Sequence, residues 1–282
     1  MQPDGQITRF APSPTGPLHL GHAYSALIAA SHGRSGQFLL RIEDIDQTRC
    51  TPAFEAQIYD DLHWLGLVWP TPVMRQSDRR PAYHAALRKL NGLGVLYPCR
   101  CTRGDIRAAL SAPQEGAAMI GPDGVVYPGT CRGRAMSDAG AADALRLDMR
   151  RALSLVGFVG FVENGPLYGG HHRLDGDHMI ANIGDVVLSR RDMGTSYHLS
   201  VVVDDAAQDI TEVTRGADLF DATAIHALLQ ALLELPQPTY WHHDLIRDKS
   251  GKRLAKRDDA RALSTYRAAG ASPADIRAMV NL

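Results

Sequence analysis

A proline-rich turn at residues 9–22, RFAPSPTGPLHLGH, constrains the fold of this chain more than any other feature. The run before it, QITRF at 6–10, predicts a short strand, and residues 21–36 after it predict a helix closed by glycine. In an open α/β sheet, ligands collect where the first strand gives way to its helix, because the helix N-terminus offers unpaired N–H groups and a partial positive charge. We therefore expect a nucleotide-binding α/β fold with a ligand at this turn.

Further strands and helices follow the turn. The apolar run QFLLRIEDID at 37–46 ends in carboxylates and predicts a buried parallel strand. YHLSVVVDD at 197–205 predicts a second strand of this kind. Residues 53–66, 78–94 and 218–235 have the spacing of helices, the last stopped by Pro236, and a Cys-, Gly- and Pro-rich stretch interrupts the pattern at about 99–132.

This order of elements predicts a Rossmann-like, doubly wound parallel sheet. We expect its first half at residues 1–98, an insertion at 99–190, its second half at 191–244, and a basic loop with a short C-terminal helical segment at 245–282. With 282 residues, 45% of them hydrophobic and 22% charged, the chain is typical of soluble globular proteins. It has neither a secretory signal nor an apolar run long enough for a membrane, so we expect a cytoplasmic protein.

His19 and His22 lie three residues apart at the predicted helix N-terminus. Both imidazoles can reach one ligand there, donate to phosphate oxygens and stabilise the charge on a departing pyrophosphate. The alternative is a helix capped by Thr15 or Ser13, with two incidental histidines on the surface. The turn alone does not decide between these interpretations.

A basic stretch far downstream favours the first one. DKSGKRLAKR at 248–257 carries five cations around a glycine, a pattern that by itself is usually a solvated loop. Together, however, PLHLGH and RLAKR resemble the HIGH and KMSKS motifs of class I aminoacyl-tRNA synthetases. Arg253 stands for the first lysine of the second motif and Ala255 for its serine, which leaves the energetics of loop closure open.

Four separated blocks resemble the catalytic domain of glutamyl-tRNA synthetases: RFAPSPTGPLHLGH, RIEDID, YHLSVVVDD and VTRGADL. Only 25 residues follow Arg257, so we expect no helical anticodon-binding domain, and we expect the cysteine-bearing stretch to be an insertion. Both features are similar to the subfamily that attaches glutamate to the queuosine base of tRNA(Asp). The resemblance implies ATP, L-glutamate and queuosine-bearing tRNA(Asp) as partners, no membrane, and a monomer.

The reaction implied by the resemblance has two steps. A glutamate carboxylate attacks the α-phosphate of ATP, with Mg²⁺ bridging the phosphates, and gives glutamyl-adenylate and pyrophosphate. A hydroxyl of the cyclopentene ring of queuosine then attacks the activated carbonyl. By resemblance, the catalytic residues are His19, His22 and Lys256, and the ATP-binding residues are His19, Gly21, His22, Arg253 and Lys256.

A glutamate pocket needs cations for two carboxylates and an anion for the ammonium. Arg9 and Arg215 offer forked donors to carboxylates, and Glu43 can pair with the ammonium, although each could instead form a surface ion pair. By resemblance, the pocket is completed by Phe10, Ala11, Pro12, Ser13 and Tyr197. Glutamyl-tRNA synthetases typically have Asn four residues after the pocket tyrosine, whereas this chain has Val201, which indicates weaker amino-acid binding.

The cysteines of the insertion suggest a metal site. Cys99, Cys101 and Cys131 offer three thiolates to one structural Zn²⁺, and the alternative is three inert buried thiols. The resemblance to the queuosine-modifying subfamily implies Tyr127 as the fourth ligand. His171 and His172 are its chemical rivals.

The net charge of −1 excludes a globally basic nucleic-acid coat, so tRNA must be met by a local patch. Candidate patches are residues 247–261 and the arginines of the insertion, Arg100, Arg103, Arg107, Arg132 and Arg134. Three other functions stay open: a minimal glutamyl-tRNA synthetase that charges the tRNA 3′ end, a non-catalytic nucleotide- or RNA-binding paralogue, and, more remotely, a nucleotidyltransferase.

Overall fold

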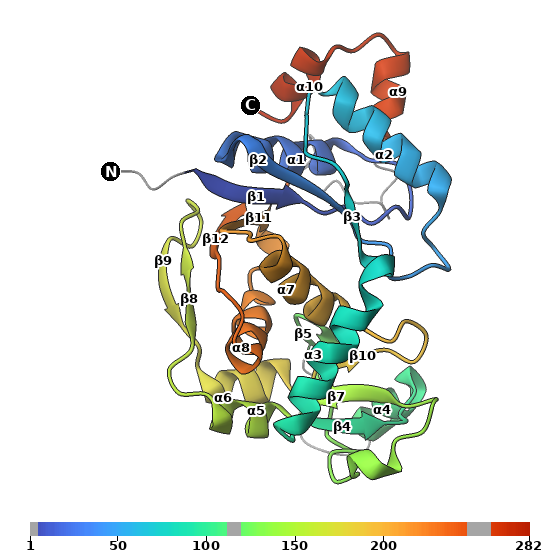
Figure 1. Cartoon of the computed structure of the whole chain (residues 1–282), viewed down its shortest axis with the longest axis vertical. Coiled ribbons are helices and arrows are strands. Elements are labelled where there is room, and N and C mark those ends of the chain that lie inside the picture. Colours follow the sequence, from blue (N-terminus) through green and yellow to red (C-terminus); the bar gives the residue numbers. More distant parts are fainter. Residues whose placement is uncertain (1–4, 112–119, 247–260) are drawn as a thin grey trace.

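Parallel strands and helices alternate near both ends of the described chain, as the sequence predicts for an α/β fold, while most strands between them are antiparallel. The computed structural model describes residues 5–111, 120–246 and 261–282. The strands within residues 6–75 and 212–243 lie in the upper half of Figure 1, those within 160–173 lie at its left, and a separate antiparallel sheet lies at the bottom.

The first sheet contains the strand that precedes the proline-rich turn. β1 (Gln6–Phe10) pairs in parallel with β2 (Gly33–Ile42), and β2 pairs in parallel with β3 (Met74–Arg75). α1 (Leu20–His32) connects β1 to β2 and packs Ala23, Ala26 and Leu27 into the same core. The strand predicted at 37–46 is thus confirmed, but it ends at Ile42, so that Glu43 lies just beyond its carboxyl end.

The second sheet lies beside the first. β11 (Glu212–Gly216) follows Thr211, whose N–H donates to the carbonyl oxygen of Ile7 at 3.0 Å. β12 (Thr239–His243) pairs in parallel with both β11 and β8 (Gly160–Glu163), and β9 (Gly170–Arg173) is antiparallel to β8. α8 (Thr223–Leu233) connects β11 to β12. β8 and β9 come from the range predicted as an insertion, and the division of the chain at residues 98, 190 and 244 stays a prediction.

The antiparallel sheet is built from β4 (Leu96–Cys99), β7 (Ala144–Leu147) and β10 (Val187–Ser189), in the order β10-β7-β4. Short elements surround it: α4 (Arg103–Ser111), the hairpin of β5 (Ile120–Gly121) and β6 (Gly124–Val125), α5 (Met149–Leu155), α6 (Gly176–His178) and a π-helical turn at Met179–Ile183. Cys99 at the end of β4 brings the cysteine-rich stretch to this sheet.

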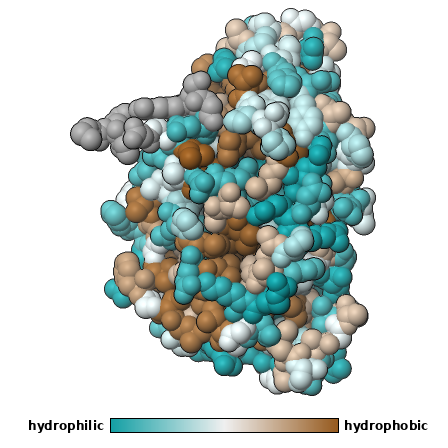
Figure 2. Space-filling model, in the orientation of Figure 1, coloured by the Kyte–Doolittle hydropathy of each residue, from teal (hydrophilic) through white to brown (hydrophobic). Residues whose placement is uncertain are grey.

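The remaining helices close the two cores. α2 (Pro52–Trp64) and the C-terminal helices α9 (Leu263–Ala268) and α10 (Pro273–Met279) share a core with α1, so the C-terminal segment is helical, as predicted. α3 (Arg80–Gly92) packs with α8 in the larger core. In Figure 2, hydrophobic residues gather at the middle and lower left of the face, over the region of α7, α8 and α5.

One predicted strand is wrong. Residues 197–205 belong to a helix, α7 (Tyr197–Ala207), which begins where the Ser196 hydroxyl accepts the N–H of Leu199. The helix is buried on several faces, with Leu199, Val201 and Val202 in the core, and it therefore lacks the polar face that marks an amphipathic helix. Buried helices and buried strands can both contain a short apolar run rich in valine, so composition does not distinguish them here. In the part of the chain that the structure describes, no helix has the length and hydropathy needed to cross a membrane.

Asp61 on α2 is an ionisable side chain inside the core. It is 2% exposed, and its Oδ2 atom has no hydrogen-bond partner among the described residues. Burial raises the pKa of Asp61 from 3.8 to about 6, against an opposing effect of Arg267. Because the folded chain holds this proton more tightly than the unfolded chain, the free energy of unfolding falls as the pH rises through this range.

Asp61→Asn should therefore stabilise the protein at neutral pH. The amide keeps the shape of the side chain and removes the buried charge, so we expect the free energy of unfolding at about pH 7.5 to rise by about 2 kcal/mol. The gain should shrink at about pH 5, where the folded parent carries the proton. Urea denaturation at both pH values measures the difference, and a variant no more stable than the parent at the higher pH would contradict the buried charge.

Candidate active site

A cavity of about 620 Å³ opens where the carboxyl ends of β1 and β11 meet the N-terminus of α1. It brings together every predicted glutamate- or ATP-binding residue that lies within the described ranges. These are Arg9, Phe10, Ala11, Pro12, Ser13, His19, Gly21, His22, Glu43, Tyr197 and Arg215. The position of the cavity is the one expected for a ligand in an open α/β sheet.

His19 and His22 cap α1 themselves. Nδ1 of His19 accepts the N–H of Gly21 at 3.1 Å, and Nδ1 of His22 accepts the N–H of His19 at 3.2 Å. The interpretation in which Thr15 or Ser13 caps the helix is therefore wrong. Because each Nδ1 accepts a hydrogen bond, each ring is neutral and carries its proton on Nε2. The rings are stacked with centroids 3.8 Å apart, and both residues line the cavity.

The predicted ATP-binding residues Arg253 and Lys256 fall in 247–260 and lie outside the described residues. The chain before this segment lines the cavity, and the chain after it pairs with residues of the turn before α1. Leu245 and Ile246 line the cavity before the segment. After it, Ala262 forms an antiparallel bridge with His19, and Leu263 donates its N–H to the carbonyl oxygen of Leu18 at 2.8 Å.

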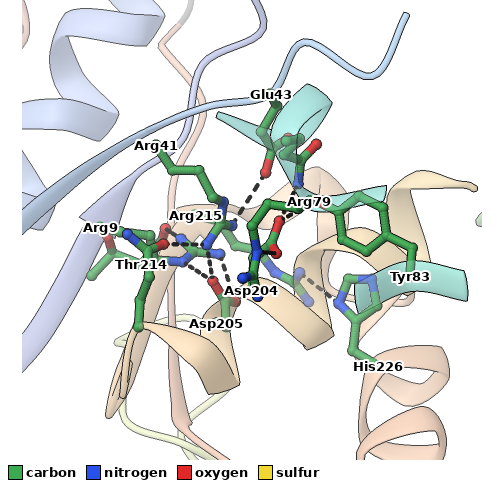
Figure 3. Close-up of polar contacts among 12 residues, drawn as sticks. Arg9, Arg41, Glu43, Arg79, Tyr83, Asp204, Asp205, Thr214, Arg215 and His226 are labelled. Atoms are coloured by element: carbon green, nitrogen blue, oxygen red, sulfur yellow. Dashed lines mark hydrogen bonds and ion pairs between the residues drawn. The ribbon is translucent and has the colours of Figure 1, made fainter. Parts of the chain in front are cut away.

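A buried cluster of charges (Figure 3) contributes Arg9 and Glu43 to one wall of the cavity. Asp205 on α7 accepts Nε and Nη2 of Arg9 at 2.9 and 3.2 Å, and Nη1 of Arg41 at 2.6 Å. Nη2 of Arg41 also lies 3.2 Å from Oε1 of Glu43. Burial acts to raise the pKa of Asp205, but the guanidinium groups of Arg9 and Arg41 hold it below its ordinary value. The cluster thus keeps a full negative charge between two cations.

Glu43 lies at the edge of this cluster and lines the cavity. Burial raises its pKa by more than Arg41 and Arg9 lower it. An additional cation would stabilise the ionised form of the buried Glu43 carboxylate, because it would restore part of the stabilisation that burial removes. The surroundings of Glu43 therefore favour an ammonium partner.

Arg215 differs from Arg9 in its partners. It donates to His242 at 3.1 Å, His226 at 2.9 Å and Thr223 at 2.6 Å, all of them uncharged acceptors. Within the described ranges, no ion pair joins Arg215 to a carboxylate, whereas Arg9 shares Asp205. Its charge is consequently the less neutralised of the two at the cavity.

Tyr197 and Val201 lie one helical turn apart on α7, and both line the cavity. Burial raises the pKa of Tyr197, so that it stays a phenol that can donate a hydrogen bond. The position at which this sequence departs from glutamyl-tRNA synthetases therefore faces the same space as the pocket tyrosine.

Four residues of this site received no role in the sequence analysis: Arg41, Asp205, His226 and His242. Arg41 and Asp205 stand within or at the end of apolar runs, where a charged residue is the only signal of a buried ion pair. His226 is one of three polar residues in the otherwise apolar α8, which is equally consistent with a core histidine. Their roles depend on contacts between distant segments.

The predicted metal ligands also come together. The Sγ atoms of Cys99, Cys101 and Cys131 lie within 4.8 Å of one another. The Tyr127 hydroxyl lies 3.4 Å from Sγ of Cys99 and 3.3 Å from Sγ of Cys101. Burial acts to raise the pKa of Cys131, but the Tyr127 hydrogen bond and further N–H and S–H donors lower it to about 7. This cluster of three thiols can bind a metal ion.

The rivals for the fourth ligand lie elsewhere. His171 and His172 belong to β9, in the sheet of β8, β11 and β12, while Cys99 ends β4 in the antiparallel sheet. Neither histidine is part of the metal-ligating group found in the described part of the chain. Tyr127 is thus the predicted fourth ligand that the fold brings next to the three sulfurs.

The arginines of the insertion differ in how they are held. Arg132 and Arg134 pair with Asp185 and Asp143 at 2.7 and 2.9 Å, so their charges are used within the fold. A different cavity, of about 840 Å³, runs past the cysteines toward β10, and its basic lining residues are Arg103, Arg107, Arg146, Arg190 and Arg191.

The fold is that of a class I tRNA synthetase catalytic domain. The family model described as tRNA synthetases class I (E and Q), catalytic domain, matches residues 7–125 and 163–282. The chain is 60% identical to a glutamyl-Q tRNA(Asp) synthetase of Rhodobacter capsulatus, over 98% of this chain and 100% of that protein. It is 41% identical to one of Nocardia farcinica, over 98% and 84%. The chain therefore belongs to the glutamyl-Q tRNA(Asp) synthetase family.

A solved structure supports this class. A glutamate tRNA ligase from Elizabethkingia meningosepticum, in complex with its amino acid, superposes with a TM-score of 0.68 at 29% identity. The match covers 89% of this chain and 51% of the ligase. The chain thus spans about half of the length of that enzyme.

Asp205→Asn should destabilise the fold strongly. The substitution leaves Arg9 and Arg41 buried without their shared anion, and breaking a buried ion pair costs about 3 to 5 kcal/mol. Urea denaturation measures this loss. Asp209→Asn, an exposed change a few residues along, is the matched control. Equal midpoints for the two variants would contradict a structural role of the cluster.

Proposed function

We propose that this chain activates glutamate with ATP and transfers it to the queuosine base of tRNA(Asp). The observation that carries the proposal is one cavity lined both by Arg215, a cation suited to a carboxylate, and by the two histidines that cap α1. Membership of the glutamyl-Q tRNA(Asp) synthetase family supports the same function. The Arg215 side of the cavity suits glutamate, and the side at the N-terminus of α1 suits ATP.

In the proposed amino-acid site, Arg215 binds a carboxylate of glutamate. One N–H on each of its terminal nitrogens is left over from the hydrogen bonds to His226 and Thr223. Arg9 can add its remaining N–H groups, Glu43 accepts the ammonium, and Tyr197 donates its hydroxyl. Phe10, Ala11, Pro12 and Ser13 shape the wall from the turn after β1.

In the proposed first step, a carboxylate oxygen of glutamate attacks the α-phosphorus, and the bond to pyrophosphate breaks. The Nε2–H groups of His19 and His22 donate to phosphate oxygens at the helix N-terminus, where negative charge is favoured. Mg²⁺ would arrive with ATP and neutralise part of the phosphate charge. Arg253 and Lys256, outside the described residues, are proposed to contact the leaving pyrophosphate because Ile246 before their segment lines the cavity and Ala262 after it pairs with His19.

A neighbouring cavity of about 300 Å³ offers room for the second step. It shares Ser13, Thr15, Glu43 and Tyr197 with the first cavity and continues toward Arg190. A hydroxyl of the queuosine ring that enters here can attack the carbonyl of glutamyl-adenylate. The new ester bond forms as AMP leaves, and the hydroxyl proton is released.

The arginine-lined cavity next to the cysteines is the proposed tRNA contact. Arg103, Arg107 and Arg191 are exposed there, and Arg190 lines both this cavity and the one proposed for the base. Phosphate contacts of this kind position an RNA without reading its sequence. Arg190 would therefore link the proposed tRNA contact to the proposed site of the base.

The alternative function, charging of the tRNA 3′ end, draws on the likeness to glutamate tRNA ligases. Against it, the chain is 60% and 41% identical to relatives named glutamyl-Q tRNA(Asp) synthetase but 29% and 27% identical to the glutamate tRNA ligases. Val201 in the cavity is a further departure from the glutamyl-tRNA synthetase pattern.

Labelling with radioactive glutamate and ATP separates these functions. We expect label on tRNA(Asp) that carries queuosine and none on the same tRNA without it, because the queuosine hydroxyl is the acceptor. Removal of the 3′-terminal adenosine from the modified tRNA should leave the labelling unchanged. Equal label on both tRNAs, or its loss after trimming, would favour the 3′-charging enzyme.

We also propose that Cys99, Cys101, Cys131 and Tyr127 hold one structural Zn²⁺. Four ligands at ordinary zinc distances place neighbouring sulfurs about 3.8 Å apart in a tetrahedron, since Zn–S bonds are about 2.3 Å. Sγ of Cys101 lies 3.5 Å from Sγ of Cys131, and all three sulfurs fall within 4.8 Å, so the donor set fits this ion. The ion would tie the end of β4 to the chain after β6 in the proposed insertion.

Metal analysis tests the zinc proposal. The purified protein should contain about one zinc per chain, and Cys131→Ser should lose it, because a structural site needs its thiolates. Cys50→Ser, a thiol outside the cluster, should keep the metal. Tyr127→Phe should bind zinc more weakly in a competition with a chelator. A zinc content unaffected by Cys131→Ser would refute the site.

A further inference from the structure

The hydrogen bonds of Arg215 fix the protonation of two buried histidines. Arginine has only donors, so every ring atom that it contacts must be an unprotonated nitrogen. Nε of Arg215 donates to Nε2 of His242 at 3.1 Å, and Nη1 donates to Nδ1 of His226 at 2.9 Å. Burial lowers the pKa of both histidines. Each ring is therefore neutral, and its single N–H is on the nitrogen that faces away from Arg215.

Both outward N–H groups lead to carboxylates. Nδ1 of His242 lies 2.5 Å from Oε2 of Glu163, which is as buried as the ring itself. Nε2 of His226 lies 3.1 Å from Nδ1 of His198, and Nε2 of His198 lies 3.3 Å from Oδ1 of Asp123. A carboxylate can only accept a hydrogen bond when it is ionised. Each relay therefore ends in a group that selects the tautomer that Arg215 requires.

The Glu163 carboxylate is held rigidly for this contact. Its Oε1 atom accepts the backbone N–H groups of Gly165 and His242, both at 2.8 Å, which leaves Oε2 for the imidazole. The chain at Gly165 approaches so closely that a Cβ atom there would overlap Oε1. The two backbone donors thus fix which oxygen faces His242.

We propose that Glu163 is a positioning residue for substrate: it fixes the tautomer of His242, and this tautomer holds Arg215 as an unneutralised cation at the cavity. A carboxylate in direct contact with Arg215 would compete with the carboxylate of the substrate. The neutral ring orients the guanidinium and keeps the negative charge of Glu163 one residue away. The inference rests on the proposed function, in which Arg215 binds glutamate.

Glu163→Gln tests the tautomer directly. The backbone donors of Gly165 and His242 retain the amide oxygen at the position of Oε1, so the amide NH₂ faces Nδ1 of His242. This nitrogen must then accept, the ring proton moves to Nε2, and a donor faces the Nε–H of Arg215. A similar change of carboxylate to amide beside a catalytic histidine disables serine proteases through the wrong tautomer.

Glu212→Gln is the matched control. Glu212 is a buried glutamate of β11, in the same sheet, and its Oε1 lies 2.6 Å from Nδ1 of His32. The His32 ring packs against Trp241, and no hydrogen bond joins it to Arg215 in the described part of the chain. The control therefore makes the same chemical change at a Glu–His pair that does not reach the cavity.

Pyrophosphate exchange with varied glutamate, in the presence of queuosine-bearing tRNA(Asp), supplies the kinetic readout. We expect Glu163→Gln to raise the KM for glutamate at least about tenfold and to leave the KM for ATP within about twofold, because a buried donor of Arg215 loses its acceptor. Glu212→Gln should change neither value. An equal effect of the two substitutions on the KM for glutamate would overturn the proposal.

Nitrogen-15 NMR of the histidine rings supplies a readout that needs no substrate. The unaltered protein should show His242 protonated at Nδ1 alone, and Glu163→Gln should invert this state. A ring protonated at Nε2 in the unaltered protein would overturn the proposal even if Glu163→Gln failed to fold. If the unaltered protein showed no exchange with glutamate, the proposed function would fall and the role in glutamate binding with it, while the NMR spectrum would still decide the tautomer.

Discussion

The active-site end of this fold depends on one carboxylate. Asp205 of α7 binds the guanidinium groups of Arg9 from β1 and Arg41 from β2, and all three side chains are nearly inaccessible to water. Neighbouring parallel strands carry the two arginines, and neither cation has another acidic partner as close as Asp205 among the described residues. The helix is therefore locked against the carboxyl ends of both strands. The cavity forms at this junction because the turn after β1, Glu43 after β2 and Tyr197 on α7 all lie beside the same charge cluster.

The cluster also makes the two arginines of the cavity different in charge. Arg9 is largely neutralised by Asp205, so it is a structural cation that retains some donors, whereas the partners of Arg215 are uncharged. A binding site for an anion needs a cation of the second kind, since an internal carboxylate would compete with the ligand. From the sequence alone, the same role is predicted for Arg9 and Arg215, because both are arginines. Only the contacts of the folded chain distinguish them.

Local patterns predict the parts of this protein that depend on local physics. β1, the turn and α1 follow from a strand signal, prolines and a helix of ordinary composition, and the cysteine cluster follows from the spacing of thiols together with the family resemblance. The strand predicted at 197–205 is wrong because a helix buried on several faces lacks the polar stripe that identifies its period. The sequence did not indicate the roles of Arg41, His226 and His242, because their partners belong to other elements of the fold. The local sequence of one element does not show how it is placed against another.

The same physical rule links the two ends of the cavity. In the helix cap, backbone N–H groups occupy Nδ1 of His19 and His22, so both rings become donors at Nε2 and suit an anion such as phosphate. Around Arg215, a donor-only cation occupies one nitrogen of His226 and of His242, so both rings become acceptors that support a cation. Neutral imidazoles thus serve opposite purposes around one cavity, which His19 and His22 line while His226 and His242 contact Arg215. In each case a contact outside the ring determines the tautomer. A site built in this way keeps its donors and acceptors in fixed places before any substrate arrives, which removes the cost of reorganising them during the reaction.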